Sequence, residues 1–341
     1  MQVRYRYRLY PSPGAGGIPA VHDGEDVNNR SGRRSGPRTN RSRLAAALAV
    51  GLAACGTAAC SSLSPAASPQ AGASRAAPSA PVRSPSAQAS PSPSPTPTPH
   101  VVISRVRAAD GSVVTVAAFR GPVQYVLHNG SEDPGAAAAG LVRAGPAVTG
   151  AERQRLLAAF NGGFELSAGA GGYEQEGHVI AALRPGLASL VIDRSGQARI
   201  GIWGSSVPAA GEEVYSVRQN LQPLVYRGQP TAASADPGLW GATLGGGEDV
   251  ARSAVGQDSY GDLLFAGSMA ATPADLATAL ASRGTRIAME LDINPEWIQL
   301  DVAAAPGGPL TAAIPGQFRP PDQYITGWTR DFFAVLGQPP G

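Results

Sequence analysis

The stretch Gly284–Trp297, GTRIAMELDINPEW, joins a short apolar strand pattern to two carboxylates at its end. Because side chains alternate across a strand, we expect Glu290 and Asp292 to share one face, opposite the apolar residues between them. Their Cβ atoms would lie roughly 7 Å apart, close enough for both carboxylates to approach one substrate. Pro295 cannot extend a central ladder, so the strand should end beside this pair. The segment predicts a sheet with an acidic pair at its rim, and a solvated strand end is the alternative.

Other patterns predict several strands and few helices. Strand-like alternation covers residues 100–107, 112–120, 123–128, 187–193 and 198–203. Thr149 and Glu152 resemble a capping box, which predicts a short helix through Leu157. The run Thr272–Asp275 supplies an N-cap, a first-turn proline and an acid for a second helix that ends at Gly284. We therefore predict an α+β fold with a mixed, largely antiparallel sheet and a few short helices in one globular domain.

The charge distribution separates the N-terminal part of the chain from the rest. The net charge is +2 and the sequence contains no lysine. Residues 1–54 hold nine arginines and three acidic residues, whereas residues 100–341 hold 16 arginines and 22 acidic residues. A protein that binds nucleic acid concentrates positive charge on its folded domain. This distribution excludes a nucleic-acid partner.

The apolar run 44–54 follows a basic segment and precedes Cys55, which is the order of a secretory signal. The run is too short to span a bilayer. Leu52–Cys55 resembles a bacterial lipobox, which implies that Cys55 is lipid-modified and begins the mature chain. Cys60 is a weaker candidate, and a cleaved signal without lipidation is the alternative. We expect an N-terminal extension and signal peptide over 1–54, and an exported protein anchored by lipid to the outer face of the cell membrane.

Residues 55–99 are dominated by Ser, Pro and Ala and end in PSPSPTPTP. Such a composition cannot bury a core, so we expect a disordered, lipid-anchored linker. Residues 100–341 contain no cysteine and are long enough to bury a single core. The same residues contain no GxxxxGK[ST], HExxH or GxSxG motif. Carboxylate, amide and guanidinium side chains therefore remain as the candidates for a functional site in this domain.

Three segments together resemble one family. Asn161–Phe164, NGGF, resembles the NGGFF signature of the phosphodiester glycosidases, and Arg252–Gly256, RSAVG, is similar to that family's R[ST]A[IV]G segment. The helix from Thr272 and the following IAMELD resemble the family's final helix and strand, which in many members end in LDGGGSS. Here Ile293–Trp297 stands in place of the glycines and serines. The resemblance implies a phosphodiester glycosidase-like domain over residues 100–341 and a sugar phosphodiester substrate.

The residue chemistry suggests a role for each candidate. Arg252 suits a phosphate because its planar fork matches two oxygens. Asp292 is the candidate base or nucleophile, and Glu290 would raise its pKa or share a metal with it. The choice between these two acids as the catalytic group stays open. Asn161 offers an amide for sugar hydroxyls, and Gly162 and Gly163 let the backbone approach a ligand.

Further candidates lie outside these motifs. Arg218 and Asn220 form a polar cluster that could contact a second phosphate or sugar group, and Trp297 and Trp240 could stack on a sugar. The motifs identify no particular cofactor, and Glu290, Asp292 and Asn294 could bind a divalent cation such as calcium.

We expect a cell-surface hydrolase that cleaves a sugar 1-phosphodiester at the glycosidic bond, with a sugar phosphate or cell-envelope glycan as substrate. The alternatives are a non-catalytic glycan-binding lipoprotein and a metal-dependent phosphodiesterase.

Overall fold

Strand β14 (Thr285–Glu290) lies inside a seven-stranded sheet, between β12 on one side and β10 on the other. The computed structural model describes residues 100–241 and 247–338. The sheet has the order β1-β2-β13-β12-β14-β10-β11. Its other strands are β1 (Val101–Arg107), β2 (Val113–Phe119), β10 (Pro223–Tyr226), β11 (Gln229–Pro230), β12 (Val250–Asp258) and β13 (Leu263–Ala271).

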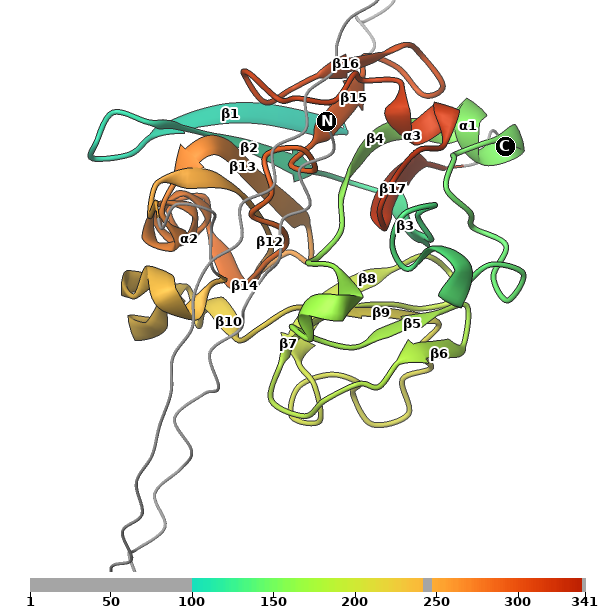
Figure 1. The fold of residues 1–341 in the computed structure, drawn as a ribbon, viewed down its shortest axis with the longest axis horizontal. Helices are drawn as coiled ribbons and strands as arrows, with labels where there is room; N and C mark the ends of the chain where they lie inside the picture. Colours follow the sequence, from blue (N-terminus) through green and yellow to red (C-terminus); the bar gives the residue numbers. More distant parts are fainter. Residues whose placement is uncertain (1–99, 242–246, 339–341) are drawn as a thin grey trace, which may run out of the picture. The chain divides into compact units, whose positions relative to one another are not determined.

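The described residues also form two five-stranded sheets (Figure 1). The first has the order β16-β15-β4-β17-β3, with β3 (Val123–His128), β4 (Leu156–Asn161), β15 (Leu300–Ala303), β16 (Leu310–Ala312) and β17 (Phe332–Gly337). The second has the order β6-β5-β9-β7-β8, with β5 (Tyr173–Gln175), β6 (His178–Ala181), β7 (Ala188–Ile192), β8 (Ala198–Ile202) and β9 (Ser216–Gln219). Adjacent strands in the described sheets are antiparallel, which confirms the largely antiparallel prediction. The sequence predicted one sheet, whereas the described residues form three.

The main core lies where the three sheets meet. Four phenylalanine rings, Phe119, Phe160, Phe265 and Phe333, are fully buried there and come from two of the sheets. Phe160 stacks on Phe119 with ring centroids 5.5 Å apart and contacts Phe333 at 5.2 Å. Burying each ring stabilises the fold by about 1.5–3 kcal/mol. This core fixes β4, β17 and β14, whose ends build the site described below.

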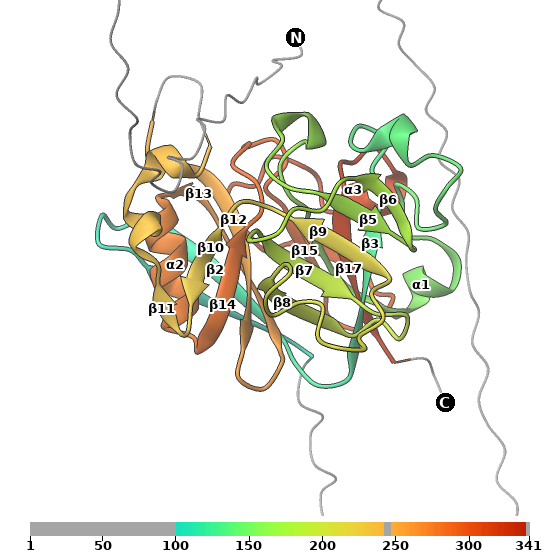
Figure 2. The ribbon, with the colours of Figure 1, turned by 90° about the horizontal axis from the view of Figure 1, so that it is seen from below.

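The alternation predicted for β14 is confirmed up to the strand's last residue. Met289 packs into the main core, whereas Ala288 packs into a second cluster under helix α2 (Pro273–Ala281). This helix has the predicted capping box, because Thr272 accepts from the backbone of Asp275 and Asp275 accepts from the backbone of Thr272. Figure 2 shows α2 beside β14 and β10 at one side of the fold.

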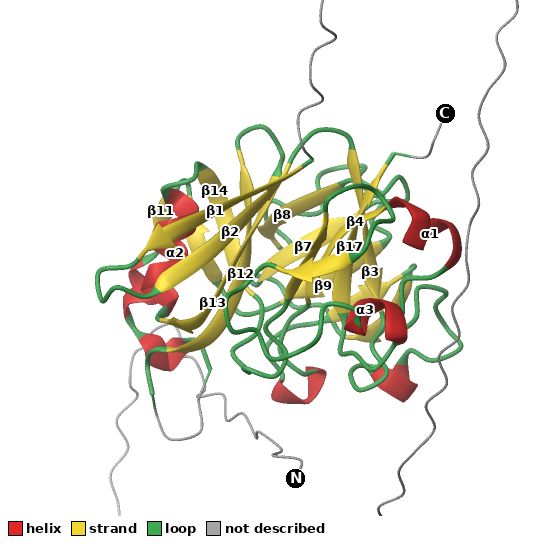
Figure 3. Ribbon diagram, turned by 90° about the horizontal axis from the view of Figure 1, so that it is seen from above, coloured by secondary structure: helices red, strands yellow, loops and turns green. Residues whose placement is uncertain are grey.

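The other helices are short and lie at the margins of the sheets (Figure 3). They are α1 (Gly150–Arg155), α3 (Gln323–Thr326) and the 3-10 turns η1 (Gly135–Ala137), η2 (Leu166–Ala168), η3 (Ala232–Ala235) and η4 (Pro237–Leu239). The capping box predicted at Thr149 is wrong, since its side chain makes no cap bond and Glu152 faces His128 Nε2 at 3.3 Å. The helix also ends earlier than predicted, because Leu156 begins β4.

The predicted signal, the lipidation of Cys55 and the linker over 55–99 lie outside the described residues. Within residues 100–241 and 247–338, no helix is both long and apolar enough to cross a membrane.

Candidate functional site

A narrow polar cleft opens where β4 and β14 end and β17 begins. The free space inside it is about 10 Å³, room for about one water molecule. Its walls come from the Asn161–Gly163 turn, Asp292, Trp297 and the segment Thr329–Asp331, together with Gln299, Gln323 and Tyr324. Of the predicted site residues, Asn161, Gly162, Gly163 and Asp292 therefore meet in one place. Glu290, Arg252, Arg218 and Asn220 do not line the cleft.

Asp292 lies just beyond the end of β14 and is 1% exposed. Its Oδ1 accepts the backbone N–H groups of Ile293 at 2.7 Å and Asn294 at 3.1 Å, which fixes the carboxylate in the turn that ends the strand. Its Oδ2 accepts from Arg330 Nη1 at 3.1 Å. Burial raises the pKa of Asp292 to about 6, opposed by Arg330 and by the two backbone donors. The group is therefore an ionised carboxylate at neutral pH and a protonated acid below about pH 6.

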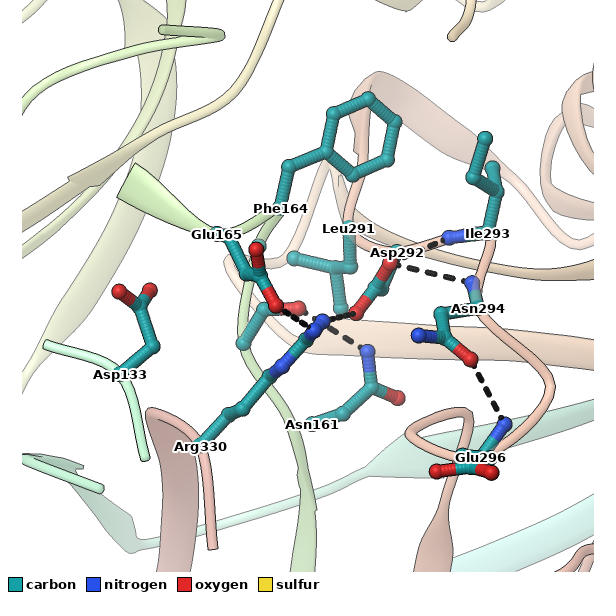
Figure 4. Close-up of polar contacts among 12 residues, drawn as sticks. Asp133, Asn161, Phe164, Glu165, Leu291, Asp292, Ile293, Asn294, Glu296 and Arg330 are labelled. Atoms are coloured by element: carbon teal, nitrogen blue, oxygen red, sulfur yellow. Dashed lines mark hydrogen bonds and ion pairs between the residues drawn. The ribbon is translucent and has the colours of Figure 1, made fainter. Parts of the chain in front are cut away.

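Arg330 occupies the centre of the site (Figure 4). Its Nη1 donates to Asp292 and its Nη2 donates to Glu165, so one guanidinium separates two carboxylates. The guanidinium carbon also lies 4.8 Å from the centroid of the Trp297 ring. Such a fork matches the oxygens of a carboxylate or phosphate. Arg330 therefore places a guanidinium in the lining of the cleft, paired with two carboxylates.

The predicted phosphate ligand, Arg252, is instead enclosed in the fold. It is 1% exposed and donates from Nη1 to Glu290 Oε1 at 2.7 Å and to the Trp240 carbonyl at 3.2 Å, and from Nε to the Ala271 carbonyl at 3.2 Å. Glu290 is fully buried, and burial raises its pKa to about 7 against the opposing effect of Arg252. The two predicted acids thus have different arginine partners, and the structure does not bring them together on one substrate.

Tight packing explains the two glycines of the Asn161–Gly163 turn. A Cβ at Gly162 would lie 2.0 Å from Asp331 Oδ2, and one at Gly163 would lie 2.8 Å from the guanidinium carbon of Arg218. Asn161 has its amide fully engaged, since Nδ2 donates to Ser253 Oγ and the Gly162 carbonyl and Oδ1 accepts from the Gln299 backbone. The turn therefore shapes the cleft through its backbone, and its asparagine holds that shape.

Arg218 and Asn220, both predicted as ligand contacts, lie behind this turn. Arg218 is 1% exposed and donates to Asp331 Oδ2 at 2.8 Å and to the Phe164 carbonyl. Asn220 donates to the carbonyls of Glu290 and Leu291, each at 3.0 Å. These two side chains tie the turn after β4 to the end of β14 and so position the cleft.

Sequence reasoning missed four charged residues around the cleft: Asp133, Glu165, Arg330 and Asp331. Burial raises the pKa of Asp133 to about 6, and the nearby Asp331 raises it further. One detectable signal was the pair Arg330–Asp331 directly before the fully buried strand β17, because charged residues at the end of a buried strand need partners. Glu165 likewise follows the NGGF motif directly.

Arg319 contacts two tryptophan rings, one of which, Trp297, lines the cleft. The guanidinium carbon of Arg319 lies 4.5 Å from the Trp297 ring centroid and 4.2 Å from that of Trp328. Arg319 also pairs with Glu296 at 3.1 Å. Trp297 lines the cleft and contacts Arg319 and Arg330, and its stacking on a sugar stays a prediction. Trp240 is fully buried under α2 and donates to the Ala233 carbonyl.

The described residues do not fit the metal site that the acids suggested. Among them, no group of three or more His, Cys, Asp or Glu side chains is arranged to hold an ion. Glu290 and Asp292 each pair with an arginine, and Asn294 Oδ1 accepts from the Glu296 backbone. A cation at this position would have to displace a guanidinium.

Neither a protein-family model nor a curated protein sequence matches the chain. Among solved structures, the catalytic domain of zebrafish N-acetylglucosamine-1-phosphodiester alpha-N-acetylglucosaminidase, auto-inhibited by its pro-peptide, is 17% identical with a TM-score of 0.43, over 70% of this chain and 82% of that one. A hypothetical protein from Synechocystis is 13% identical with a TM-score of 0.41, over 70% of this chain and 62% of that one. These values describe a distant likeness in fold and carry no argument about the site.

Proposed function

We propose that this protein is a hydrolase that cleaves a sugar 1-phosphodiester at its glycosidic bond, with Asp292 as base or nucleophile and Arg330 as phosphate ligand. The observation that carries the proposal is the single guanidinium that contacts Asp292 on the wall of a narrow cleft. The anomeric carbon of such a substrate is bonded to a phosphate oxygen. A phosphate on Arg330 would therefore bring that carbon beside Asp292.

The reaction needs one base and a ligand for the leaving group. In the direct route, Asp292 accepts a proton from water as the water oxygen forms a bond to the anomeric carbon. The bond from that carbon to the bridging phosphate oxygen breaks, and its electron pair leaves with the phosphate. Because phosphate is already a good leaving group, a strong general acid is less necessary than in ordinary glycoside hydrolysis. The products are a free sugar and a phosphomonoester.

Incubation of the full chain with a sugar 1-phosphodiester in ¹⁸O-labelled water tests the proposal. Cleavage at the glycosidic bond places the label on the sugar, whereas cleavage at phosphorus places it on phosphate. We expect labelled free sugar, unchanged by a chelator and lost in Asp292→Asn. Label on phosphate with chelator sensitivity would favour the metal-dependent phosphodiesterase and refute the proposal.

Glycan binding without turnover is the second candidate, and one observation favours it. Both oxygens of Asp292 are hydrogen-bonded, and the carboxylate is almost fully buried. Retained binding of the diester with no product under any pH tested would select this candidate.

We further propose that the domain acts in the cell envelope, held by lipid on Cys55. The support is the sequence order of basic segment, apolar run and lipobox-like tetrapeptide. Detergent partitioning of the native protein tests this part independently of any activity.

A further inference from the structure

Glu165 and Asp292 share Arg330 but are held very differently. The side chain of Asp292 is 1% exposed, and two backbone N–H groups fix its Oδ1. The side chain of Glu165 is 32% exposed, and its other side-chain contact is the hydroxyl of Ser167, which donates to Oε2 at 3.3 Å. The Glu165 side chain can therefore turn away from Arg330 into solvent at small cost. The Asp292 side chain is held beside Arg330 by burial and by its two backbone hydrogen bonds.

Arg330 itself is fixed on the wall of the cleft. Its ring contact with Trp297 and its bond to Asp292 hold the guanidinium, and Asp133 and Arg330 form a backbone bridge. If Glu165 turned away, Nη2 would lose this carboxylate while Nη1 stayed on Asp292. A planar guanidinium in this state binds an oxyanion with directed hydrogen bonds.

We infer that Glu165 is an internal stand-in for the substrate's anion: it occupies the Nη2 side of Arg330 in the free protein and is exchanged for a monoanionic phosphodiester oxygen on binding. The inference rests on the proposed function for the identity of the anion. Exchange of one single negative charge for another leaves the charge balance around Arg330 unchanged. A dianionic phosphomonoester adds a second negative charge close to Asp292.

This charge count predicts selectivity between substrate and product. Repulsion between Asp292 and the extra charge should weaken the dianion relative to the diester by about tenfold or more at low salt. The site would then hold the diester and release the phosphomonoester formed from it. Glu165 would return to Arg330 as the product leaves.

Calorimetric titration of the full chain with dimethyl phosphate, a monoanionic diester, tests the exchange. Removing a competing carboxylate whose side chain is 32% exposed should tighten binding roughly three- to fivefold, so Glu165→Gln should bind dimethyl phosphate that much better than wild type. The matched control is Glu212→Gln, because Glu212 pairs with Arg199 at 2.8 Å outside the cleft and should leave binding unchanged. Arg330→Gln should abolish binding, and melting temperatures report whether each variant folds.

Equal or weaker binding by Glu165→Gln than by wild type would overturn the inference, as would no binding by either at millimolar anion. If hydrolysis persists in that case, the proposed function stands and the exchange alone fails. Tighter binding by Glu165→Gln without hydrolysis by wild type would support the anion site and refute the hydrolase.

Discussion

Asp292 is the residue at which stability and the proposed activity oppose each other. Burial raises its pKa to about 6 from an ordinary 3.8, so the folded protein ionises this group less readily than the unfolded chain does. A raised carboxylate pKa destabilises the folded state as pH rises. The loss begins near pH 3.8, where the unfolded chain ionises, and is complete above about pH 6. By linkage it amounts to about 3 kcal/mol at neutral pH.

The substitution Asp292→Asn removes this titration. The amide oxygen can still accept from the backbone of Ile293 and Asn294, while the bond from Arg330 is lost at a cost of about 1.5–3 kcal/mol. We therefore expect stability close to that of wild type at pH 7.5. Between pH 4.5 and 7.5, the free energy of unfolding of the variant should gain about 2 kcal/mol relative to wild type. Urea unfolding of both proteins at each pH measures this difference.

Whereas Asp292→Asn should gain stability relative to wild type as pH rises, it should lose activity. The variant should lose 10²- to 10⁴-fold in kcat/KM, the range typical of a missing general base. For wild type, kcat/KM should rise with pH up to about 6 and then level, because the base must be ionised. Near-normal turnover by Asp292→Asn would refute the catalytic role. A stability difference that does not vary with pH would refute the buried-carboxylate argument.

Three further predictions follow from packing and from the sequence. Gly162→Ala should lose about 3 kcal/mol or more of unfolding free energy, because its Cβ would collide with Asp331. The control Gly145→Ala, whose Cβ would meet no atom within 4 Å, should change the free energy of unfolding by under about 1 kcal/mol. Equal losses in the two variants, measured by urea unfolding, would contradict this prediction. Arg252→Lys should lower the free energy of unfolding by about 3 kcal/mol with KM unchanged, and a raised KM in a stable variant would restore Arg252 as a ligand. Cys55→Ser should release the protein from the detergent phase into the medium, and equal partitioning of both proteins would exclude lipidation.

Local patterns predicted the elements well where the pattern and the packing agree. The alternation in β14 and the capping box of α2 both have the predicted form, since each depends on residues within one turn or strand. The helix from Gly150 is shorter than predicted because Leu156 joins a buried sheet strand, and tertiary pairing overrides a local cap. Sequence alone also could not divide the seventeen strands of the described residues among three sheets.

The site was predicted less completely because its charges pair across the fold. Asp292 and the NGG turn were identified from sequence and meet in the cleft. Arg330, which joins Asp292 to Glu165, lies 38 positions after Asp292, and no local spacing distinguishes it from Arg252 or Arg218. Which arginine faces which acid is decided by the strand order, and that order is a property of the assembled core.

The three buried arginines then differ in one respect that bears on function. Arg252 with Glu290 and Arg218 with Asp331 are pairs in which both side chains are at most 1% exposed, so neither pair can admit a ligand without leaving a buried charge unpaired. Arg330 has one partner of that kind, Asp292, and one that reaches solvent, Glu165. Within the described part of the chain, the first two pairs hold the cleft walls in place. In the proposed mechanism, Arg330 is therefore the arginine of the three that exchanges a partner for an anion, beside the proposed base Asp292.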